Sequence, residues 1–326
     1  MASKMLGIEI GSDSLKMTLV KKGTVVAMAS ERLPDHLVRE GRVVSPATMS
    51  QFVKEMLKKY RLPKGECALV LPPQVVVAQR LTMPVMTEAE LKLNLPYEFR
   101  DYVGKDSSEY DFDYIVIGIE GGVMELYAAA CRRQLVEDYY AIFKKAGLTL
   151  KQAMPAEMAW LNLISAAKKA PRKLCIVDIG HRSTRVNIFE NGNYVMGKDI
   201  EYAGQLLDET IAAEMNIDPH AARTHKELNN KKVQSADFLQ GTYGMIALEI
   251  MKTLSFFNYS SSSEDGELQD LYYCGGCSSI EPLRTAIVKA TGMTPHHIFR
   301  LLDMTETVSD MALCCGLAAG AALQKQ

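Results

Sequence analysis

The sequence predicts an α/β protein with two lobes that share an internal duplication. Residues 174–194 read as a strand, a tight turn, a second strand and a further turn, with Asp178 closing the first strand. Residues 6–28 repeat this pattern without a gap, at a constant offset of 169 positions (178 − 9 and 192 − 23). A supersecondary unit that recurs half a chain away predicts one copy in each lobe. At 326 residues, of which 48% are hydrophobic, the chain is long enough for two cores.

The two copies match at the positions that carry chemistry. At the shared offset, Glu9 falls on Asp178, Ile10 on Ile179, Gly11 on Gly180, Ser14 on Ser183, Lys16 on Arg185 and Gly23 on Gly192. Each copy therefore offers a carboxylate, a glycine turn with a small hydroxyl residue beside it, and a basic residue. Glycine after a strand-terminal acid lets backbone amides approach an anion that a Cβ would block. Two such hairpins facing each other can bind a polyphosphate and its Mg²⁺ between two lobes.

Composition and charge exclude several other classes of function. A net charge of −2 argues against a nucleic-acid-binding surface, so we expect no nucleic acid among the partners. The N-terminus carries no apolar run of signal-peptide length, and the apolar run at residues 311–323 is too short to span a bilayer. Seven cysteines, an odd number with Cys314 and Cys315 adjacent, do not indicate a disulfide framework. We therefore expect a cytoplasmic protein without direct insertion into a membrane.

The first lobe is predicted to open with strands and one helix. Residues 5–30 read as three strands in a meander. Residues 46–60 are predicted to be helical because their apolar side chains recur at helical spacing. Residues 67–71 read as a buried strand that ends at Pro72.

A self-contained β-α-β-β-α block is predicted to follow within the first lobe. It comprises a strand at 75–83, a helix from 88 to about 102, strands at 110–119 and 123–130, and a helix at 133–145. Thr87 and Glu90 have capping-box spacing at the start of the first helix. Gly121 and Gly122 supply the turn between the two strands, and Gly147 ends the second helix.

The second lobe continues with helices around the second hairpin. We predict helices at 154–167, 205–215, 217–228, 238–259 and 310–323, one beginning near 279, a polar loop at 260–266 and a strand at 271–274. Gly275 and Gly276 separate that strand from its helix, and such glycines let a flat base or sugar lie against bare backbone. Gly316 and Gly320 are expected to let the last helix approach the helix at 154–167 closely. His296 and His297 are expected in a surface loop.

The pair Cys274 and Cys277 permits two interpretations. A CxxC motif can bind zinc or an iron–sulfur cluster, or act as a redox dithiol. Zinc requires two further ligands, and neither the adjacent histidines at 296–297 nor the adjacent cysteines at 314–315 have ligand spacing. The other interpretation, which we favour, is that the two thiols are small side chains flanking a glycine loop.

The duplicated hairpins resemble the paired phosphate-binding hairpins of the actin-like ATPase superfamily. Within it, the chain is most similar to the PilM family of type IV pilus assembly proteins, relatives of the division protein FtsA. The inserted block carries part of this resemblance, through Leu81-x-Met83-Pro84, Thr87-x-x-Glu90 and Tyr97-Glu98, and the segment 249–257 resembles a family helix. The resemblance implies a two-lobed actin-like ATPase fold, with duplicated RNase H-like lobes and the inserted subdomain.

The resemblance also implies how the chain is divided. The expected parts are the first lobe at 1–73, the inserted subdomain at 74–150, an inter-lobe linker helix at 151–170, the second-lobe core at 171–204 and 238–300, a small helical subdomain at 205–237, and a closing helix of the first lobe at 301–326. FtsA proteins carry a membrane-seeking amphipathic tail beyond this last helix. We expect no such tail here, which favours the PilM family.

By resemblance, the cofactor is ATP or ADP with Mg²⁺. The implied contacts are Glu9, Gly11, Ser12, Lys16, Asp178, Gly180, Ser183, Gly204, Lys226, Gly275 and Gly276. Glu9 and Asp178 would hold Mg²⁺ largely through water, and Lys16 would neutralise the β- and γ-phosphates. Gly275 and Gly276 would face the adenosine, and Lys226 corresponds in position to a lysine that binds the ribose.

Four positions depart from the superfamily's pattern. Glu9 replaces an aspartate and carries its carboxylate about one methylene (~1.5 Å) further. His181 and Arg182 are larger than the residues usual after the second glycine and either crowd the γ-phosphate or, through Arg182, bind it. Ala222 stands where a ribose-binding glutamate is expected. We therefore expect weak nucleotide binding and at most weak ATPase activity, with no catalytic residue assigned.

The function implied by the resemblance is that of a scaffold. The protein would lie at the inner face of the cytoplasmic membrane and bind the N-terminal cytoplasmic tail of a PilN-like inner-membrane protein. The expected peptide groove lies near residues 75–102. The host system would be a type IV pilus, or a related type II secretion or competence system, and self-association into a homo-oligomer stays open.

Three alternatives share the hairpins. One is an FtsA-like cell-division or cytoskeletal ATPase, which would form filaments. A small-molecule kinase would need a positioned aspartate base, for which the sequence offers no motif. An ATPase that activates an iron–sulfur dehydratase would use cysteines that bridge a dimer.

Overall fold

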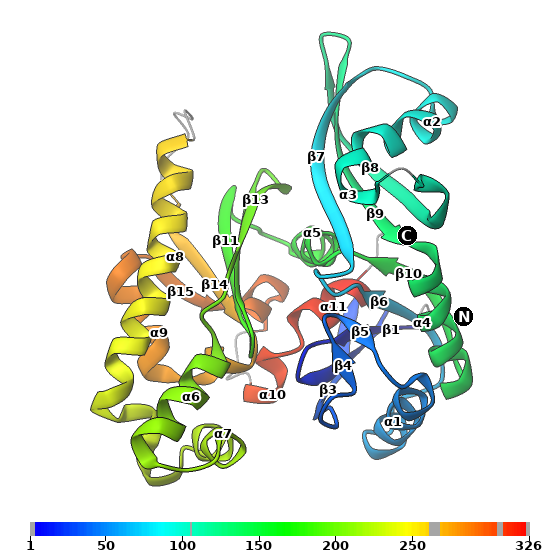
Figure 1. The fold of residues 1–326 in the computed structure, drawn as a ribbon. Helices are drawn as coiled ribbons and strands as arrows, with labels where there is room; N and C mark the ends of the chain where they lie inside the picture. The colour runs from blue at the N-terminus through cyan, green and yellow to red at the C-terminus, as the bar shows by residue number, and fades with distance from the viewer. Residues whose placement is uncertain (1–3, 105, 261–267, 305–308, 324–326) are drawn as a thin grey trace. The chain divides into compact units, whose positions relative to one another are not determined.

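The computed structural model describes residues 4–104, 106–260, 268–304 and 309–323. The chain divides into two compact units. Unit 1 comprises Met1–Asn162 with Leu317–Gln326, and unit 2 comprises Leu163–Gly316. Each unit contains one five-stranded sheet with helices packed on it, as Figure 1 shows.

The sheet of unit 1 has the strand order β10-β6-β1-β2-β3. Its strands are β1 (Lys4–Ile10), β2 (Ser14–Lys21), β3 (Thr24–Arg32), β6 (Gly65–Val70) and β10 (Leu148–Met154). The first three form an antiparallel meander, and β6 and β10 continue the sheet in parallel with β1. The short pair β4 (Val38–Arg39) and β5 (Arg42–Val43) forms a separate ribbon.

The sheet of unit 2 has the order β13-β12-β11-β14-β15. Its strands are β11 (Lys173–Ile179), β12 (Thr184–Glu190), β13 (Asn193–Ile200), β14 (Asp270–Cys274) and β15 (Thr294–His297). Again three strands form an antiparallel meander, and two further strands run parallel to the first. The two sheets therefore have the same topology.

The match between the hairpins extends to details of the backbone. Glu9 pairs with Lys16 across β1 and β2, and Asp178 pairs with Arg185 across β11 and β12. A bulge interrupts the next strand pair between Leu19 and Val20 in unit 1, and between Ile188 and Phe189, 169 positions later, in unit 2. The turns at Lys22-Gly23 and Asn191-Gly192 both have positive φ at both residues. The predicted duplicated α/β fold is confirmed.

The core of unit 1 lies between its sheet and the helices α1 (Pro46–Lys59) and α4 (Arg133–Ala146). Ser45 caps α1 and Pro46 occupies its first turn, where a missing N–H costs nothing. Tyr139 and Phe143 of α4 are fully buried in this core. Gly147 ends α4 in the left-handed conformation, as the sequence predicts.

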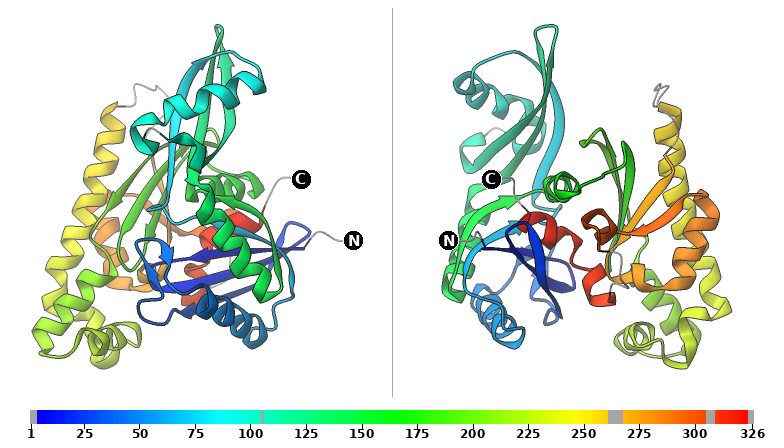
Figure 2. Two further views of the ribbon diagram at one scale, coloured as in Figure 1. Left: turned by 45° about the vertical axis from the view of Figure 1, so that its right-hand side comes forward. Right: turned by 180° about the vertical axis from the view of Figure 1, so that it is seen from behind.

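The inserted subdomain has its own sheet, with the order β7-β9-β8, and its own core (Figure 2). It is built from β7 (Val76–Pro84), α2 (Glu88–Glu98), α3 (Arg100–Val103), the 3₁₀ turn η1 (Ser107–Glu109), β8 (Tyr110–Glu120) and β9 (Val123–Arg132). Both hydrogen bonds of the predicted capping box are present between Thr87 and Glu90.

Two expectations for this block differ from the structure. The single helix predicted from 88 to about 102 is interrupted at Phe99, shortly after Pro96, whose missing N–H weakens the turn it enters. The final helix of the predicted block is α4, and it packs in the main core of unit 1 rather than in the core of the subdomain. Its apolar face therefore serves the larger sheet.

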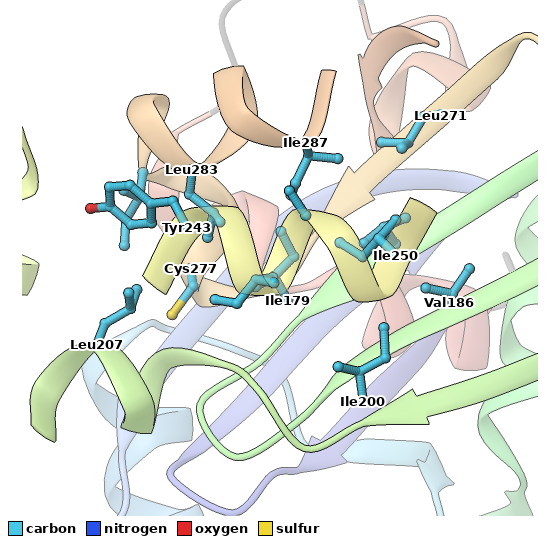
Figure 3. Close-up of a cluster of buried hydrophobic side chains, with 14 of the residues drawn as sticks. Ile179, Val186, Ile200, Leu207, Tyr243, Ile250, Leu271, Cys277, Leu283 and Ile287 are labelled. Carbon is cyan, nitrogen blue, oxygen red and sulfur yellow. The ribbon is translucent and has the colours of Figure 1, made fainter. Parts of the chain in front are cut away.

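Unit 2 places its helices α8 (Gln240–Ser260) and α9 (Glu281–Thr291) on the sheet, together with α6 (Gly204–Met215) and α7 (Pro219–Glu227). Figure 3 shows Tyr243 and Ile250 of α8 beside Leu283 and Ile287 of α9 and Ile179 of β11. The short 3₁₀ helices are η2 (Asn230–Ser235), η3 (Asp237–Leu239), η4 (Gly276–Ser279) and η5 (Ile298–Leu302).

Small residues bring α11 (Gly316–Ala322) against the rest of unit 1. A Cβ added at Gly7 of β1 would collide with the backbone oxygen of Ala318 in α11. A Cβ at Gly320 would collide with the backbone oxygen of Ala159 in α5 (Ala156–Ala166). The predicted close approach of the last helix to the linker helix is confirmed at Gly320.

Two more expectations require correction. The helix predicted at 310–323 is two helices, α10 (Asp310–Leu313) and α11, interrupted at Cys314 and Cys315. His296 and His297 lie in the strand β15 rather than in a loop, and His296 bonds to Asp270 at 2.9 Å. The sequence analysis also did not predict strands β15 and β10, which lie at the edges of their sheets, the first with only four residues. Of the polar loop predicted at 260–266, Ser260 is instead the last residue of α8, and residues 261–266 lie outside the described residues.

Candidate functional site

The corner at the end of β1 is built around Gly11. Its amide donates to the backbone oxygen of Ser14 at 2.9 Å, which closes the turn between β1 and β2. Lys16 on β2 reaches back across the corner and pairs with Glu9 at 2.6 Å, and both side chains are only 14% exposed. A Cβ at Gly11 would lie 2.9 Å from the Lys16 ammonium. A side chain at position 11 would therefore displace the end of Lys16, while Ser12 is exposed at the tip.

The corner at the end of β11 repeats this turn. The Gly180 amide donates to the backbone oxygen of Ser183 at 3.0 Å. The basic residue behaves differently, because Arg185 makes a two-pronged ion pair with Asp199 of β13 at 2.5 and 2.6 Å. The two corners thus share their backbone while their basic residues bind different carboxylates.

The glycine loop after β14 lies directly against Asp178. Gly275 has a φ of +88°, and a Cβ there would collide with the Asp178 carboxylate and with the backbone oxygen of Ile179. Ser278 supports the loop by donating its hydroxyl to the Gly275 carbonyl at 2.7 Å. Only glycine fits between the loop and the carboxylate, so the loop and the corner form one structure. Gly276 follows, with the Cys314 sulfur 3.8 Å from its would-be Cβ.

The start of α6 joins the same cluster. Ala203 precedes the helix and has no side chain that can cap it, so backbone carbonyls of the corner take that role. Gly204 donates its amide to the Gly180 carbonyl at 3.1 Å, and Gln205 donates to the His181 carbonyl at 2.6 Å. These bonds fix the position of the second corner relative to the first turn of α6.

Lys226 of α7 contacts two residues in the first turns of α6. Its ammonium donates to the Gly204 carbonyl at 2.8 Å and pairs with Asp208 of α6 at 2.7 Å. His181 approaches the other oxygen of Asp208 at 3.7 Å. Burial raises the pKa of Asp208, and the nearby Lys226 ammonium opposes that rise. Lys226 and Asp208 are each 4% exposed, so the lysine predicted to contact ribose is engaged inside unit 2.

Sequence reasoning missed Asp208. Asp208 lies four positions after Gly204, which is about one turn along α6. That spacing in the predicted helix was the one indication in the sequence that this carboxylate lies close to the corner. Ala222, which stands where a ribose-binding glutamate was expected, is fully buried in the core of unit 2.

The cysteine pair beside the glycine loop is buried. Cys274 is 1% exposed and donates weakly to the Val177 carbonyl, and Cys277 is 7% exposed. The Cys277 sulfur lies 2.5 Å from where a Cβ of Gly204 would be, so it packs against the first turn of α6. Within the described part of the chain, no three His, Cys, Asp or Glu side chains gather into a set that could hold a metal ion.

The predicted residues thus fall into two groups, one in each unit. Unit 1 brings together Glu9, Gly11, Ser12 and Lys16, and unit 2 brings together Asp178, Gly180, Ser183, Gly204, Lys226, Gly275 and Gly276. In each group, a glycine turn closed by a backbone hydrogen bond follows a strand that carries a carboxylate.

The sequence profile of the family described as type IV pilus assembly protein PilM matches residues 7–322. The chain belongs to this family. It is accordingly a type IV pilus assembly protein with the fold of the actin-like ATPases.

Solved structures share this fold. The chain is similar to one in a "PilM-PilN type IV pilus biogenesis complex", with a TM-score of 0.82, 22% identity and 98% of each chain covered. It is also similar to the ethanolamine utilization protein EutJ from Carboxydothermus hydrogenoformans, with a TM-score of 0.64, 16% identity, and 98% of this chain and 89% of that one covered. MreB5 of Spiroplasma citri bound to ADP gives a TM-score of 0.52 at 12% identity, covering 97% and 94%. At these identities the likeness shows the fold alone.

Among the residues that the structure describes, no helix combines the length and the apolar character needed to cross a bilayer.

Proposed function

We propose that this protein is a nucleotide-binding scaffold of a type IV pilus assembly complex, and that both glycine corners contact the phosphates of ATP or ADP. The observation that carries the proposal is the shared backbone geometry of the two corners. They share strand register, the closing amide bond and the position of the following bulge. A nucleotide-bound relative with the same fold, MreB5 with ADP, supports this assignment.

The corner of unit 1 supplies positive charge. Lys16 is paired with Glu9 and lies over Gly11, so its ammonium is already fixed near the backbone that would contact a phosphate oxygen. When a phosphate binds there, the Lys16 ammonium would either leave Glu9 for the phosphate or contact both. Mg²⁺ would then be held by Glu9 and Asp178 largely through water, because a freed carboxylate oxygen is a ligand that Mg²⁺ prefers.

The corner of unit 2 would contribute a stretch of backbone without side chains, against which a ligand can lie. Gly275 lets the glycine loop contact the Asp178 carboxylate, and the adenosine would lie along Gly275 and Gly276. Lys226 would act on this site through Gly204 and Asp208, which it binds. Because Ala222 is buried and carries no carboxylate, we propose weak binding and at most slow hydrolysis, with the nucleotide acting as a conformational ligand.

The partner we propose is the N-terminal cytoplasmic tail of a PilN-like membrane protein, which would hold this chain at the inner face of the cytoplasmic membrane. Support comes from the solved PilM-PilN complex, which contains a chain of the same fold. In the inserted subdomain, β7 is an edge strand that an extended peptide can extend. Leu93 and Tyr97 of α2, one turn apart, are each 72% exposed and offer apolar contacts.

Nucleotide binding is tested by isothermal titration with MgATP and MgADP. Asp178→Ala is expected to weaken binding roughly 10–100-fold, the usual effect of removing a group that orients a metal's ligands. The control is Asp237→Ala, which removes an exposed carboxylate elsewhere in unit 2. Unchanged affinity in Asp178→Ala, with the control also unchanged, contradicts the site assignment.

The partner is tested separately with a synthetic peptide of the PilN-like tail. Tyr97→Ala is expected to weaken peptide binding by about tenfold, the loss expected for an exposed aromatic anchor. The control is Tyr140→Ala, a tyrosine that is 46% exposed on α4. A peptide that binds both variants as well as the wild type places the partner surface elsewhere.

A further inference from the structure

The solvent face of α8 is unusually apolar for an exposed helix. Its buried side packs in the core of unit 2 through Tyr243, Ile246 and Ile250, as Figure 3 shows for two of them. The opposite side carries exposed apolar side chains over its whole length. These are Met245 at 44%, Leu248 at 43%, Phe256 at 63% and Tyr259 at 93% exposed.

These residues form one stripe. At about 100° per residue, positions 241, 244, 245, 248, 252, 255, 256 and 259 fall within a sector of about 120° of the helix surface. Every one of them is exposed, and the positions between them are buried or partly buried apart from Asn258. We call this set the α8 stripe. An exposed helix face normally bears charged side chains, and here Lys252 alone does so among the eight.

Glycine opens one end of the stripe to close approach. Gly241 and Gly244 lie on it, and a Cβ built at either would have no atom within 4 Å. A second helix can therefore come near the backbone there, as small residues allow at helix–helix contacts. Large side chains fill the other end, so the stripe has a bulky half and a bare half.

We propose that the α8 stripe is a self-association surface, which binds the same stripe of a second copy of this chain in an antiparallel, two-fold arrangement. In that arrangement the bulky half of one helix meets the bare half of the other, because a two-fold contact pairs each end with its opposite. Phe256 and Tyr259 of one copy would then cover Gly241 and Gly244 of the other.

The charges of the stripe are consistent with a second copy. Lys252 pairs with Glu249 at the edge of the stripe at 2.6 Å, and Lys198 of β13 also acts on Glu249. A two-fold axis near the middle of α8 brings each Lys252 toward the Glu249 of the partner helix, so the surface is complementary to itself. The charges of Lys252 and Glu249 nearly balance, so the stripe is not complementary to a strongly charged partner.

The exposed area suits a weak dimer. The exposed parts of Phe256 and Tyr259 alone come to roughly 300 Å², since each aromatic side chain can bury 150–250 Å². Met245 and Leu248 extend this area to the size of the largest apolar patches that monomers expose, a few hundred Å², and such patches are often functional. A stable interface buries about 1,000 Å² in total, or about half of that on each copy, so the stripe lies near this threshold.

Sedimentation velocity of the full chain from roughly 1 to 200 µM tests the proposal, because a dimer with a micromolar dissociation constant changes from mostly monomer to mostly dimer over this range. The wild type is expected to shift from monomer to dimer with concentration. Leu248→Glu places a charge in the centre of the stripe and is expected to raise the dimer dissociation constant at least about tenfold. Leu228→Glu is the matched control, because Leu228 is 68% exposed at the end of α7, outside the stripe.

A charge reversal separates a second copy from any other occupant. Lys252→Glu alone sets carboxylates against carboxylates across the two-fold axis and is expected to weaken the dimer. Adding Glu249→Lys restores the complementarity and is expected to recover it. A wild type that stays monomeric throughout, or a dimer that Leu248→Glu leaves unchanged while it remains folded by circular dichroism, overturns the proposal.

Discussion

The buried pair of Lys226 and Asp208 gives the most specific prediction for stability. The Lys226 ammonium makes two contacts inside unit 2, with the Asp208 carboxylate at 2.7 Å and with the Gly204 carbonyl at 2.8 Å. Both side chains are 4% exposed. Lys226→Met keeps the length of the side chain and removes the charge. It therefore leaves a buried carboxylate and a buried carbonyl without their partner.

Breaking one half of a buried ion pair costs about 3–5 kcal/mol, because the remaining charge stays desolvated. For a unit of about 150 residues, each kcal/mol lowers Tm by roughly 2–4 °C. The transition of unit 2 in Lys226→Met is thus expected to fall by roughly 6–20 °C. Replacing both partners removes the uncompensated charge, so Lys226→Met with Asp208→Asn is expected to recover at least half of that loss.

The loss of stability caused by Lys226→Met should depend on pH. Burial raises the pKa of Asp208, and Lys226 opposes this rise. Without the lysine the folded-state pKa of Asp208 lies further above its unfolded value of about 3.9. The folded state then gains a proton more readily than the unfolded state, so stability is greatest at low pH and is lost as pH rises through the folded pKa.

Differential scanning calorimetry at about pH 7.5 and about pH 5 measures both effects, because the sign of the pH dependence follows from the raised pKa. The difference in Tm between wild type and Lys226→Met is expected to be larger at the higher pH. Two results would refute the account of this pair. One is a Tm of Lys226→Met equal to that of the wild type, and the other is a variant with both Lys226→Met and Asp208→Asn that is no more stable than Lys226→Met alone.

Further substitutions test the packing of the glycines and one helix cap. Gly275→Ala should lower the free energy of unfolding by more than about 2 kcal/mol and weaken nucleotide binding. Gly192 also has a positive φ but lies in open space, so Gly192→Ala should lower it by only about 1–2 kcal/mol. Thermal unfolding measures both losses of stability. Gly7→Ala should unfold at a markedly lower temperature because its Cβ meets the backbone of α11, and Gly118→Ala, with nothing nearby, should not. Thr87→Ala should lose about 1 kcal/mol in urea unfolding with its capping box. Equal effects in a variant and its control would contradict the packing described.

The duplication could be predicted because it leaves a local signal. A gapless match of carboxylates, glycines and turn residues is visible in the sequence, and the strand register and the bulges follow from it. The long helix α8 was equally accessible, since its buried residues recur at helical spacing over more than five turns. Such features need no knowledge of what packs against them.

The missed features depend on tertiary contacts. Strand β15 has four residues and a proline, and it exists because β14 offers a parallel edge to pair with. The role of Asp208 depends on Lys226, which lies 18 positions away and meets it only in the folded unit. The assignment of α4 to the main core follows from its contact with α1, which a reading of consecutive elements cannot reveal.

Hydrogen–deuterium exchange with and without MgATP tests most directly whether the two duplicated corners bind one kind of ligand. We predict slower exchange in the segments 9–16 and 178–185 together, because both corners would contact the phosphates. The turns of the next strand pairs, β2–β3 at 22–23 and β12–β13 at 191–192, should exchange at unchanged rates and serve as internal controls. Protection confined to one corner, or absent from both at saturating nucleotide, would contradict the account.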